Sequence, residues 1–251
     1  MIAATLDHSV LLPHMSVEEA RTSIRLGRDY KAKSCCVRPS DVSMAAQELK
    51  GSSTLVCTVI GFPHGSSTTD VKVAEAKRAV ADGAVELDMV CNIGRLRSGD
   101  DAYVLADISA VVAVARAANA IVKVILENAY LDEEQKARGC RLVESAGAEF
   151  AKTSTGFAVV SGDKAAGATI PDLVLMRATC SAGVQIKAAG GVRTLDALLR
   201  VLSLGVTRIG CTATKAILDD FDRRTETTGG VLNYSKEEAA AGGTGTATAG
   251  Y

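Results

Sequence analysis

Charged side chains interrupt or close four otherwise apolar runs of the sequence, and they are Asp88, Lys123, Lys152 and Lys187. Burying a charge is costly unless it is paired or has a function. A lysine that is desolvated beside a second ammonium gives up its proton more readily, and its free amine can condense with a carbonyl to form an imine. An iminium accepts electrons during carbon–carbon cleavage, and a nearby carboxylate and second lysine can carry the protons. These residue types at strand ends favour Schiff-base chemistry.

Other interpretations of these charges remain open. They could simply neutralise one another inside the protein. The chain could also be a barrel phosphosugar isomerase or synthase that uses acid–base chemistry alone, with Lys152 as a phosphate counter-ion, or a non-enzymatic module that binds a sugar phosphate. The combination of Asp88, Lys152 and Lys187 argues against a module without turnover. Ser-His-Asp and Cys-His catalysis are disfavoured because the three histidines all lie between His8 and His64.

Two glycine-containing loops indicate a phosphate site. Gly190-Gly191-Val192-Arg193 follows the run that contains Lys187, and Gly210-Cys211-Thr212 precedes a helical segment. Barrel enzymes commonly bind phosphate with the loops after the seventh and eighth strands and with a helix N-terminus. Lys152-Thr153-Ser154-Thr155-Gly156 adds hydroxyl groups and a turn. The sequence therefore predicts that a phosphorylated substrate binds near the lysines.

Short β-branched runs alternate with alanine-rich segments of helical period, and this alternation predicts the elements that position these residues. We expect eight strands, at Ala3–Asp7, Ser34–Val37, Thr54–Ile60, Val85–Val90, Ile121–Glu127, Ala148–Lys152, Val184–Lys187 and Thr207–Gly210. We expect eight helices, at Ser16–Asp29, Pro39–Leu49, Thr69–Asp82, Asp101–Ala118, Asp132–Ala146, Pro171–Ser181, Thr194–Leu204 and Thr212–Arg224. Eight such units in 251 residues predict an α/β fold with a single (β/α)8 TIM barrel. A doubly wound open sheet is the alternative.

The expected elements carry local signals at their ends and along their faces. Ser16, Thr69 and Thr194 have the side chains of N-caps, and Glu19 completes a capping box with Ser16. Glycines in the left-handed conformation are expected to end four helices, at Gly83, Gly147, Gly183 and Gly205. The two-residue period of strands places on common faces the pairs Glu86 with Asp88, Lys123 with Glu127, and Phe150 with Lys152.

The barrel domain is expected to span residues 1–225, and residues 226–251 are expected to form a flexible C-terminal tail. Gly242–Gly250 consists of four Gly, three Thr and two Ala. This composition is typical of a flexible segment. The sequence ends in an aromatic residue, Tyr251.

Composition excludes several classes of protein. The formal net charge is -1, from 28 basic and 29 acidic residues, which gives no field for nucleic acid or an acidic membrane. The apolar runs are too short to span a bilayer, and the start shows no secretory signal. Seven scattered cysteines fit a reducing cytoplasm. We expect a cytoplasmic enzyme with no metal, no cofactor, and neither nucleic acid nor membrane as a partner.

Six segments of the chain, in order, resemble the deoxyribose-phosphate aldolases, a family of Schiff-base aldolases. They run through the sequence from about residue 5 to 220, and the last two are highly specific. The segments are Leu6-Asp7-His8, Gly61-Phe62-Pro63-His64-Gly65, Glu86-Leu87-Asp88-Met89-Val90, Lys123-Val124-Ile125-Leu126-Glu127, Lys152-Thr153-Ser154-Thr155-Gly156-Phe157 and Lys187-Ala188-Ala189-Gly190-Gly191-Val192-Arg193.

The resemblance implies a metal-independent barrel lyase of deoxyribonucleotide catabolism and carbohydrate degradation. It would reversibly cleave 2-deoxy-D-ribose 5-phosphate to acetaldehyde and D-glyceraldehyde 3-phosphate. By position in the motifs, Lys152 is the Schiff-base lysine, Asp88 transfers protons, and Lys187 transfers protons and lowers the proton affinity of Lys152. The family's phosphate contacts fall on Thr155, Gly156, Gly190, Gly191, Arg193, Gly210 and Thr212. We expect a homodimer or a homotetramer, between which the sequence does not decide.

The chain also departs from the family pattern. Leu12-Pro13 stands where many members have Lys-Pro, and Ala213 follows Thr212 where a second hydroxyl residue is common. The segment Ala158–Ala168 is expected to form an altered loop. In some members a C-terminal tyrosine folds over the site and assists proton transfer. Tyr251 has this placement, and a tail without a catalytic role is the alternative.

Overall fold

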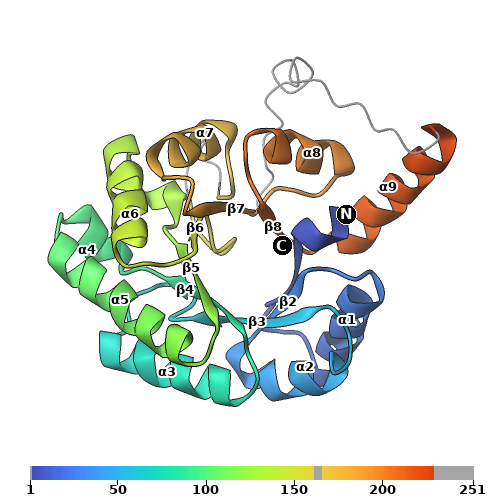
Figure 1. The fold of residues 1–251 in the computed structure, drawn as a ribbon, viewed down its shortest axis with the longest axis horizontal. Coiled ribbons are helices and arrows are strands. Elements are labelled where there is room, and N and C mark those ends of the chain that lie inside the picture. The colour runs from blue at the N-terminus through green and yellow to red at the C-terminus, as the bar shows by residue number, and fades with distance from the viewer. Residues whose placement is uncertain (1, 161–165, 229–251) are drawn as a thin grey trace.

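The computed structural model describes residues 2–160 and 166–228, and in this part of the chain eight parallel strands close into a barrel. Each strand pairs with its neighbours in sequence, and β8 pairs with β1. Figure 1 shows the strands around a common centre with the helices outside them. The strands are β1 (Leu6–Val10), β2 (Ser34–Val37), β3 (Leu55–Ile60), β4 (Glu86–Val90), β5 (Ile121–Ile125), β6 (Phe150–Lys152), β7 (Gln185–Ala189) and β8 (Arg208–Cys211). The predicted TIM barrel is confirmed.

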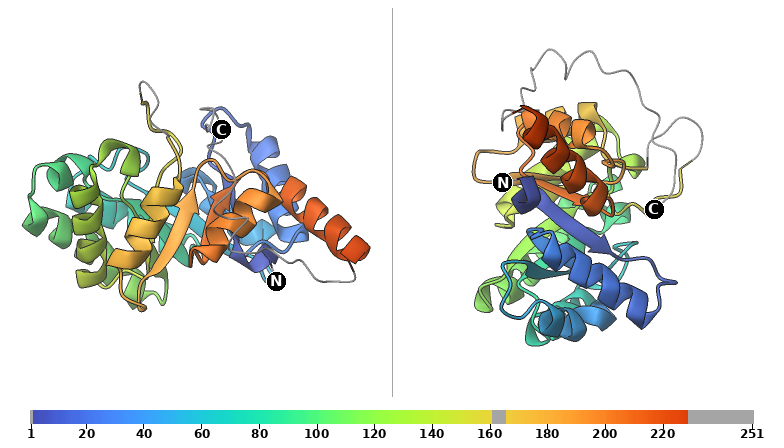
Figure 2. Two further views of the ribbon diagram at one scale, coloured as in Figure 1. Left: turned by 90° about the horizontal axis from the view of Figure 1, so that it is seen from above. Right: turned by 90° about the vertical axis from the view of Figure 1, so that its right-hand side faces the viewer.

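The helices of the described residues cover the outside of this barrel. They are α1 (Val17–Asp29), α2 (Val42–Glu48), α3 (Thr69–Ala81), α4 (Ile93–Arg97), α5 (Asp101–Ala117), α6 (Glu133–Ser145), α7 (Ile170–Thr179), α8 (Leu195–Ser203) and α9 (Thr214–Thr228), with 3-10 turns η1 (Ile2–Thr5), η2 (Pro39–Asp41) and η3 (Asn128–Tyr130). α9 lies at the side of the barrel and contacts η1 (Figure 2). It runs past residue 225, and the rest of the expected tail lies outside the described residues. None of the described helices is long and apolar enough to cross a bilayer.

The first strand is displaced from its predicted position. Ile2–Thr5 form a 3-10 turn, so β1 begins at Leu6 rather than at Ala3. The prediction was wrong because the polar residues after Leu6 look like the end of a strand. In the structure Asp7 is buried at 0% exposure and accepts a hydrogen bond of 2.6 Å from Ser34 Oγ. The barrel interior is therefore polar at this layer, and polarity does not mark the strand's end.

Two further local predictions are wrong, and each has a physical reason. Thr68 rather than Thr69 is the N-cap of α3, because the hydroxyl of Thr69 instead donates to Asp107 Oδ1 at 2.9 Å. Gly183 does not have a positive φ, because α7 ends earlier through Cys180 in an extended conformation. The other three helix-ending glycines have positive φ values, and the capping box of Ser16 is present.

The C-terminal end of β4 is fixed from outside the barrel by a buried ion pair. Lys72 on α3 and Asp107 on α5 are both 0% exposed, with Nζ and Oδ2 2.5 Å apart. The Lys72 ammonium also donates to the carbonyl of Val90, the last residue of β4, at 3.0 Å. Because β4 also carries Asp88, this pair supports a strand that matters for the site below.

We predict that Asp107→Asn lowers the free energy of unfolding by roughly 3–5 kcal/mol, because it leaves the Lys72 ammonium buried without a counter-charge. Urea unfolding measures the effect. The matched control is Asp82→Asn, which breaks the solvent-facing Arg78–Asp82 pair of α3 and should cost less than about 1 kcal/mol. Equal effects of the two substitutions would contradict the prediction.

His8 joins three elements on the outer side of β1. Its Nδ1 lies 2.8 Å from Thr214 Oγ1 on α9, and its Nε2 lies 2.9 Å from Ser23 Oγ on α1. Burial lowers the pKa of His8 from 6.5 to about 4, against a weaker opposing effect of its hydrogen bond with Ser23. Between pH 6.5 and about pH 4, the imidazole of His8 is therefore neutral in the folded state and protonated in the unfolded chain.

The depressed pKa of His8 makes stability fall with acid. The contribution of the neutral side chain is complete above pH 6.5 and is lost as pH falls towards about 4. Between pH 7 and pH 5 we expect a loss of about 2 kcal/mol in the free energy of unfolding. Urea unfolding at the two pH values should show a smaller loss for His8→Asn and an unchanged loss for His14→Asn, at an exposed position. Equal losses in all three proteins would contradict this.

Candidate active site

The barrel interior brings together the three residues predicted to carry the chemistry. Asp88 Oδ2 on β4 accepts hydrogen bonds from Lys152 Nζ on β6 at 2.6 Å and from Lys187 Nζ on β7 at 2.7 Å. Lys152 and Lys187 are register partners on neighbouring strands, so their side chains extend side by side. The exposed fractions are 0% for Asp88, 3% for Lys152 and 1% for Lys187. Lys152 closes its strand as predicted, whereas Lys187 and Asp88 lie in mid-strand, deeper in the barrel.

Four further charged residues extend this cluster. Lys123 Nζ lies 2.8 Å from Asp88 Oδ1 and 2.7 Å from Glu86 Oε2. Arg208 lies between two carboxylates, with Nη1 2.7 Å from Asp7 Oδ1 and 2.9 Å from Glu86 Oε2. Lys187 also donates to Asp7. We call the whole set the interior charge network, and its members are Asp7, Glu86, Asp88, Lys123, Lys152, Lys187 and Arg208.

Mutual attraction keeps Asp7, Asp88, Lys123 and Lys187 charged despite their burial. Burial alone would raise the pKa of Asp7 and Asp88, but the surrounding cations hold both values well below the ordinary range. Burial would lower the pKa of Lys187 and Lys123, but Asp7 and Asp88 raise both. Lys187 is therefore a firmly protonated ammonium beside Lys152. This is the neighbouring positive charge that the sequence analysis expects there.

Gly210 lies beside the side chain of Lys187. Gly210 lies within β8, and a Cβ placed there would be 3.4 Å from Lys187 Cε and 3.5 Å from Ala189 Cβ. Both separations are those of ordinary van der Waals contact, so position 210 lies directly against the lysine side chain. The structure thus places Gly210 in the wall of the network, next to one of its lysines.

Other residues expected to contact phosphate follow β7 and β8. Gly190 and Gly191 have φ values of 80° and 90°, in the left-handed region that glycine adopts without strain. A Cβ at Gly190 would lie 2.8 Å from Gly167 Cα, so the close approach of two chain segments also requires glycine. Arg193 and Thr212 are exposed beyond the ends of the same two strands. These groups lie at the end of the barrel where the carboxyl ends of the strands meet.

Thr155 and Gly156 follow β6, beyond Lys152. The Thr155 hydroxyl donates to Glu127, and its backbone N–H lies 3.2 Å from Glu127 Oε2. Burial raises the pKa of Glu127, although the bonds from Thr155 and the charge of Lys152 act in the opposite direction. Ser154 lies in the sequence between Lys152 and Thr155, and its buried Oγ has no hydrogen-bond partner among the described residues. A polar atom of this kind next to Lys152 indicates a place for a ligand hydroxyl.

Two buried thiols and an apolar cluster flank the network. The Sγ atoms of Cys36 and Cys57 and a carboxylate oxygen of Asp88 lie within 4.8 Å of one another. Cys57 Sγ is 3.3 Å from Lys123 Nζ, so an ammonium lies beside these donor atoms. The apolar cluster contains Leu11, Cys36, Cys57 and Val59, and Phe62 and Phe157 pack against it. The centroids of these two aromatic rings are 5.3 Å apart. Its burial keeps bulk water from this side of the lysines.

Four members of the network have no role that the sequence alone predicts. Asp7, Glu86 and Arg208 are not among the predicted site residues, and the sequence marks Lys123 only as a charge within a strand. The signal was present for Glu86, which the strand period places on the face of Asp88, and both residues indeed bind Lys123. Tyr251, the remaining site candidate, lies outside the described residues.

Comparisons with known proteins agree with this geometry. A sequence profile of DeoC/LacD family aldolases matches residues 1–217. Deoxyribose-phosphate aldolase 2 of Bacillus licheniformis is 45% identical over 225 residues, which cover 90% of this chain and 98% of that protein. Deoxyribose-phosphate aldolase of Bacillus cytotoxicus is 45% identical over 217 residues, which cover 86% of this chain and 94% of that protein.

Solved structures with the same fold come from related proteins. One from Coccidioides immitis, proposed to be a deoxyribose-phosphate aldolase, has a TM-score of 0.83 and 36% identity, over 88% of this chain and 87% of that one. A tetrameric deoxyribose phosphate aldolase from Aeropyrum pernix has a TM-score of 0.78 and 28% identity, over 88% of this chain and 91% of that one. With the profile match and the identities to curated relatives, these likenesses lead to one conclusion. The chain belongs to the DeoC/LacD family of aldolases.

Proposed function

We propose that the protein reversibly cleaves 2-deoxy-D-ribose 5-phosphate to acetaldehyde and D-glyceraldehyde 3-phosphate, with Lys152 as the Schiff-base residue. One observation carries the proposal above all. Inside the barrel, the Lys152 amine and the Lys187 ammonium both donate hydrogen bonds to the carboxylate of Asp88. A neighbouring positive charge favours the free-amine form that imine formation needs. The names of the relatives at 45% identity support the choice of substrate.

The proposed reaction follows from the positions of these groups. The Lys152 nitrogen adds to the C1 aldehyde of the open-chain sugar, and loss of water gives an iminium. The C3 hydroxyl then loses its proton and the C2–C3 bond breaks, which releases D-glyceraldehyde 3-phosphate and leaves an enamine on Lys152. Protonation of the enamine carbon and hydrolysis release acetaldehyde. Asp88 and Lys187 are in hydrogen-bond contact with each other and are the groups we propose to move these protons.

We propose that the substrate phosphate binds beyond the ends of β6, β7 and β8. The N–H groups of Gly190 and Gly191 and the side chains of Arg193 and Thr212 suit an anion. Thr155, Gly156 and Gly210 complete the proposed contacts. Many barrel enzymes bind phosphate with the loops that follow their seventh and eighth strands, where most of these residues lie. A phosphate anchor at the same end of the barrel as Lys152 would hold the sugar with its aldehyde towards the amine.

We further propose that residues 1–225 form the catalytic domain and that residues 226–251 form a tail which supplies Tyr251. A homodimer or homotetramer in the cytoplasm is the proposed state of the enzyme. The tetrameric relative from Aeropyrum pernix supports an assembly of this kind.

We predict that Lys152→Arg lowers turnover of 2-deoxy-D-ribose 5-phosphate by at least about 10³-fold, because a guanidinium keeps the charge but forms no imine. Acid–base catalysis with Lys152 as a counter-ion would instead survive this change. The matched control is Lys136→Arg, which alters a lysine paired with Asp172 outside the barrel and should leave turnover near its native value. Near-native turnover of a folded Lys152→Arg protein, checked by circular dichroism, would refute the assignment.

We predict that Tyr251→Phe loses most of its turnover, by roughly 10²-fold or more, with little change in KM, because the phenol hydroxyl relays a proton to the enamine carbon. Exchange of the acetaldehyde methyl protons with deuterium from solvent depends on the same proton transfer and should fall in parallel. Tyr234→Phe, elsewhere in the expected tail, is the control. Native turnover and native exchange in Tyr251→Phe would mean that this hydroxyl has no catalytic role.

A further inference from the structure

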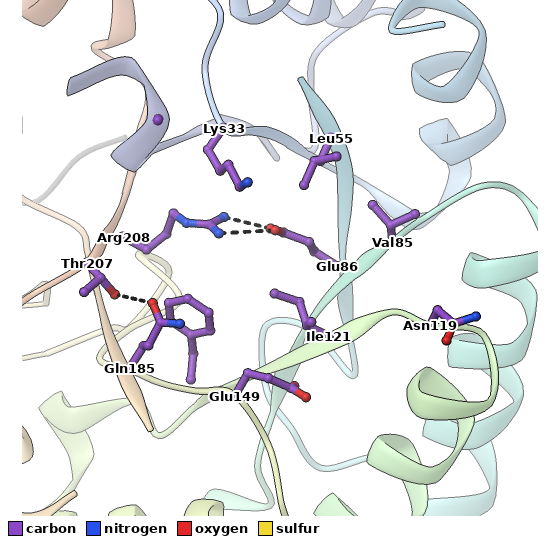
Figure 3. Close-up of a pocket in the computed structure, with 12 residues that line it drawn as sticks. Lys33, Leu55, Val85, Glu86, Asn119, Ile121, Glu149, Gln185, Thr207 and Arg208 are labelled. Carbon is purple, nitrogen blue, oxygen red and sulfur yellow. Dashed lines mark hydrogen bonds and ion pairs between the residues drawn. The ribbon is translucent and has the colours of Figure 1, made fainter. Parts of the chain in front are cut away.

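The interior charge network reaches the mouth of the barrel opposite Lys152. A cavity of about 640 Å³ opens there. Its lining includes the first residues of six successive strands, which are Leu55, Glu86, Ile121, Phe150, Gln185 and Arg208. Figure 3 shows Arg208 and Glu86 pointing towards each other across this cavity. Lys152 ends its strand at the other mouth.

We propose that Arg208 is a positioning residue for the reactive amine. By neutralising Asp7 and Glu86 from the far mouth, it leaves Lys123 and Lys187 bound to Asp88, so that Lys152 has no carboxylate to itself and reacts as a free amine. The inference rests on the proposed function, in which Lys152 forms the imine. Arg208 touches neither the proposed substrate nor Lys152, and it acts only through the interior charge network.

The contacts of Arg208 show how completely it satisfies the two carboxylates. Its Nη1 lies 2.7 Å from Asp7 and 2.9 Å from Glu86, and its Nη2 lies 3.2 Å from the second oxygen of Glu86. The guanidinium carbon is 5.3 Å from the centroid of the Phe150 ring, which holds its plane. At 6% exposure, Arg208 holds these contacts largely shielded from bulk water. Without it, Asp7 and Glu86 would need other cations.

The only other cations of the network within 4 Å of these carboxylates, among the described residues, are the two buried lysines. Lys187 bonds to Asp7, and Lys123 lies 2.7 Å from Glu86 and 3.5 Å from Asp7. Both lysines are at present shared with Asp88. Loss of the guanidinium would draw them towards Asp7 and Glu86. The Asp88 carboxylate would then have Lys152 as its main counter-ion, and Lys152 would therefore keep its proton.

The balance of charge agrees with this reasoning. In the described residues, Asp7, Glu86 and Asp88 are matched by Lys123, Lys187 and Arg208, so the network is neutral when Lys152 is an amine. The other titratable groups near it are the thiols Cys36 and Cys57, the carboxyl of Glu127 and, in the lining of the cavity, Lys33 and Glu149. Burial raises the pKa of Cys57, whereas a hydrogen bond with Cys57 lowers that of Cys36. Thr155 already bonds to Glu127, which makes no ion pair with Lys152.

The test is the pH dependence of Arg208→Gln in the full-length protein. We expect the acidic limb of kcat/KM to move upwards by about one pH unit or more, since a lost neighbouring charge typically has this effect. The initial rate at which acetaldehyde and cyanoborohydride alkylate Lys152, followed by mass spectrometry, should fall about tenfold at neutral pH and recover at higher pH. A purely structural role would lower activity at every pH and leave the limb in place.

Two variants provide matched controls. Arg208→Lys retains a cation, and its limb should stay at the native pH. The double variant Glu86→Gln/Arg208→Gln removes one negative and one positive charge, so Asp7 keeps Lys187, Asp88 keeps Lys123, and the limb should return to the native pH. Restoration by a second loss at the far mouth distinguishes the balance of charges from damage to packing.

An unmoved limb in Arg208→Gln, or a double variant that behaves like the single one, would overturn the inference. If Arg208→Gln does not fold, Glu86→Gln takes its place. Removing that carboxylate should move the limb to lower pH, and an unmoved limb would again overturn the inference. Failure of the proposed function looks different, because the native protein would then form no reduced adduct on Lys152 at any pH.

Discussion

One carboxylate shared by three lysine side chains is the interaction on which the site depends. Among the described residues, Asp88 bonds to Lys123, Lys152 and Lys187 inside the barrel. Lys123 and Lys187 have further carboxylate partners in Glu86 and Asp7. Lys152 has no second carboxylate within ion-pair distance among the described residues. It is therefore the amine that the surroundings least require to be charged, and it alone of the three lies at the carboxyl end of its strand.

The register of the parallel strands makes this close grouping of charged side chains possible. Parallel strands in register place Lys152 beside Lys187, and Asp88 beside Lys123, as neighbours on one inner surface. The apolar faces of the same strands pack outward against the helices and supply the stability that buried charges do not. Lys72 and Asp107 hold the end of β4 from the helical layer. The helices thus support the strand that carries Asp88, and the strands place the charges.

The barrel and the three central residues could be predicted from the sequence because both follow short-range patterns. Alternating strand and helix signals fix the architecture, and lysines inside apolar strands reveal a polar interior. The displaced start of β1 and the roles of Asp7 and Arg208 could not be predicted. These depend on contacts between the first and last strands, such as Asp7 with Arg208, which lie 201 positions apart and carry no local signal. Gly210 was predicted as a phosphate contact, and only the structure reveals its place beside Lys187.

The central claim is that one buried lysine alone is reactive, and borohydride reduction in the presence of acetaldehyde tests it most directly. Reduction converts an imine to a stable ethylamine, and peptide mass mapping then locates the ethyl group. In the described residues, the fully or almost fully buried lysines are Lys72, Lys123, Lys152 and Lys187. The account predicts that among these only Lys152 carries the ethyl group. An ethyl group on Lys123 or Lys187, or none on Lys152, would contradict it.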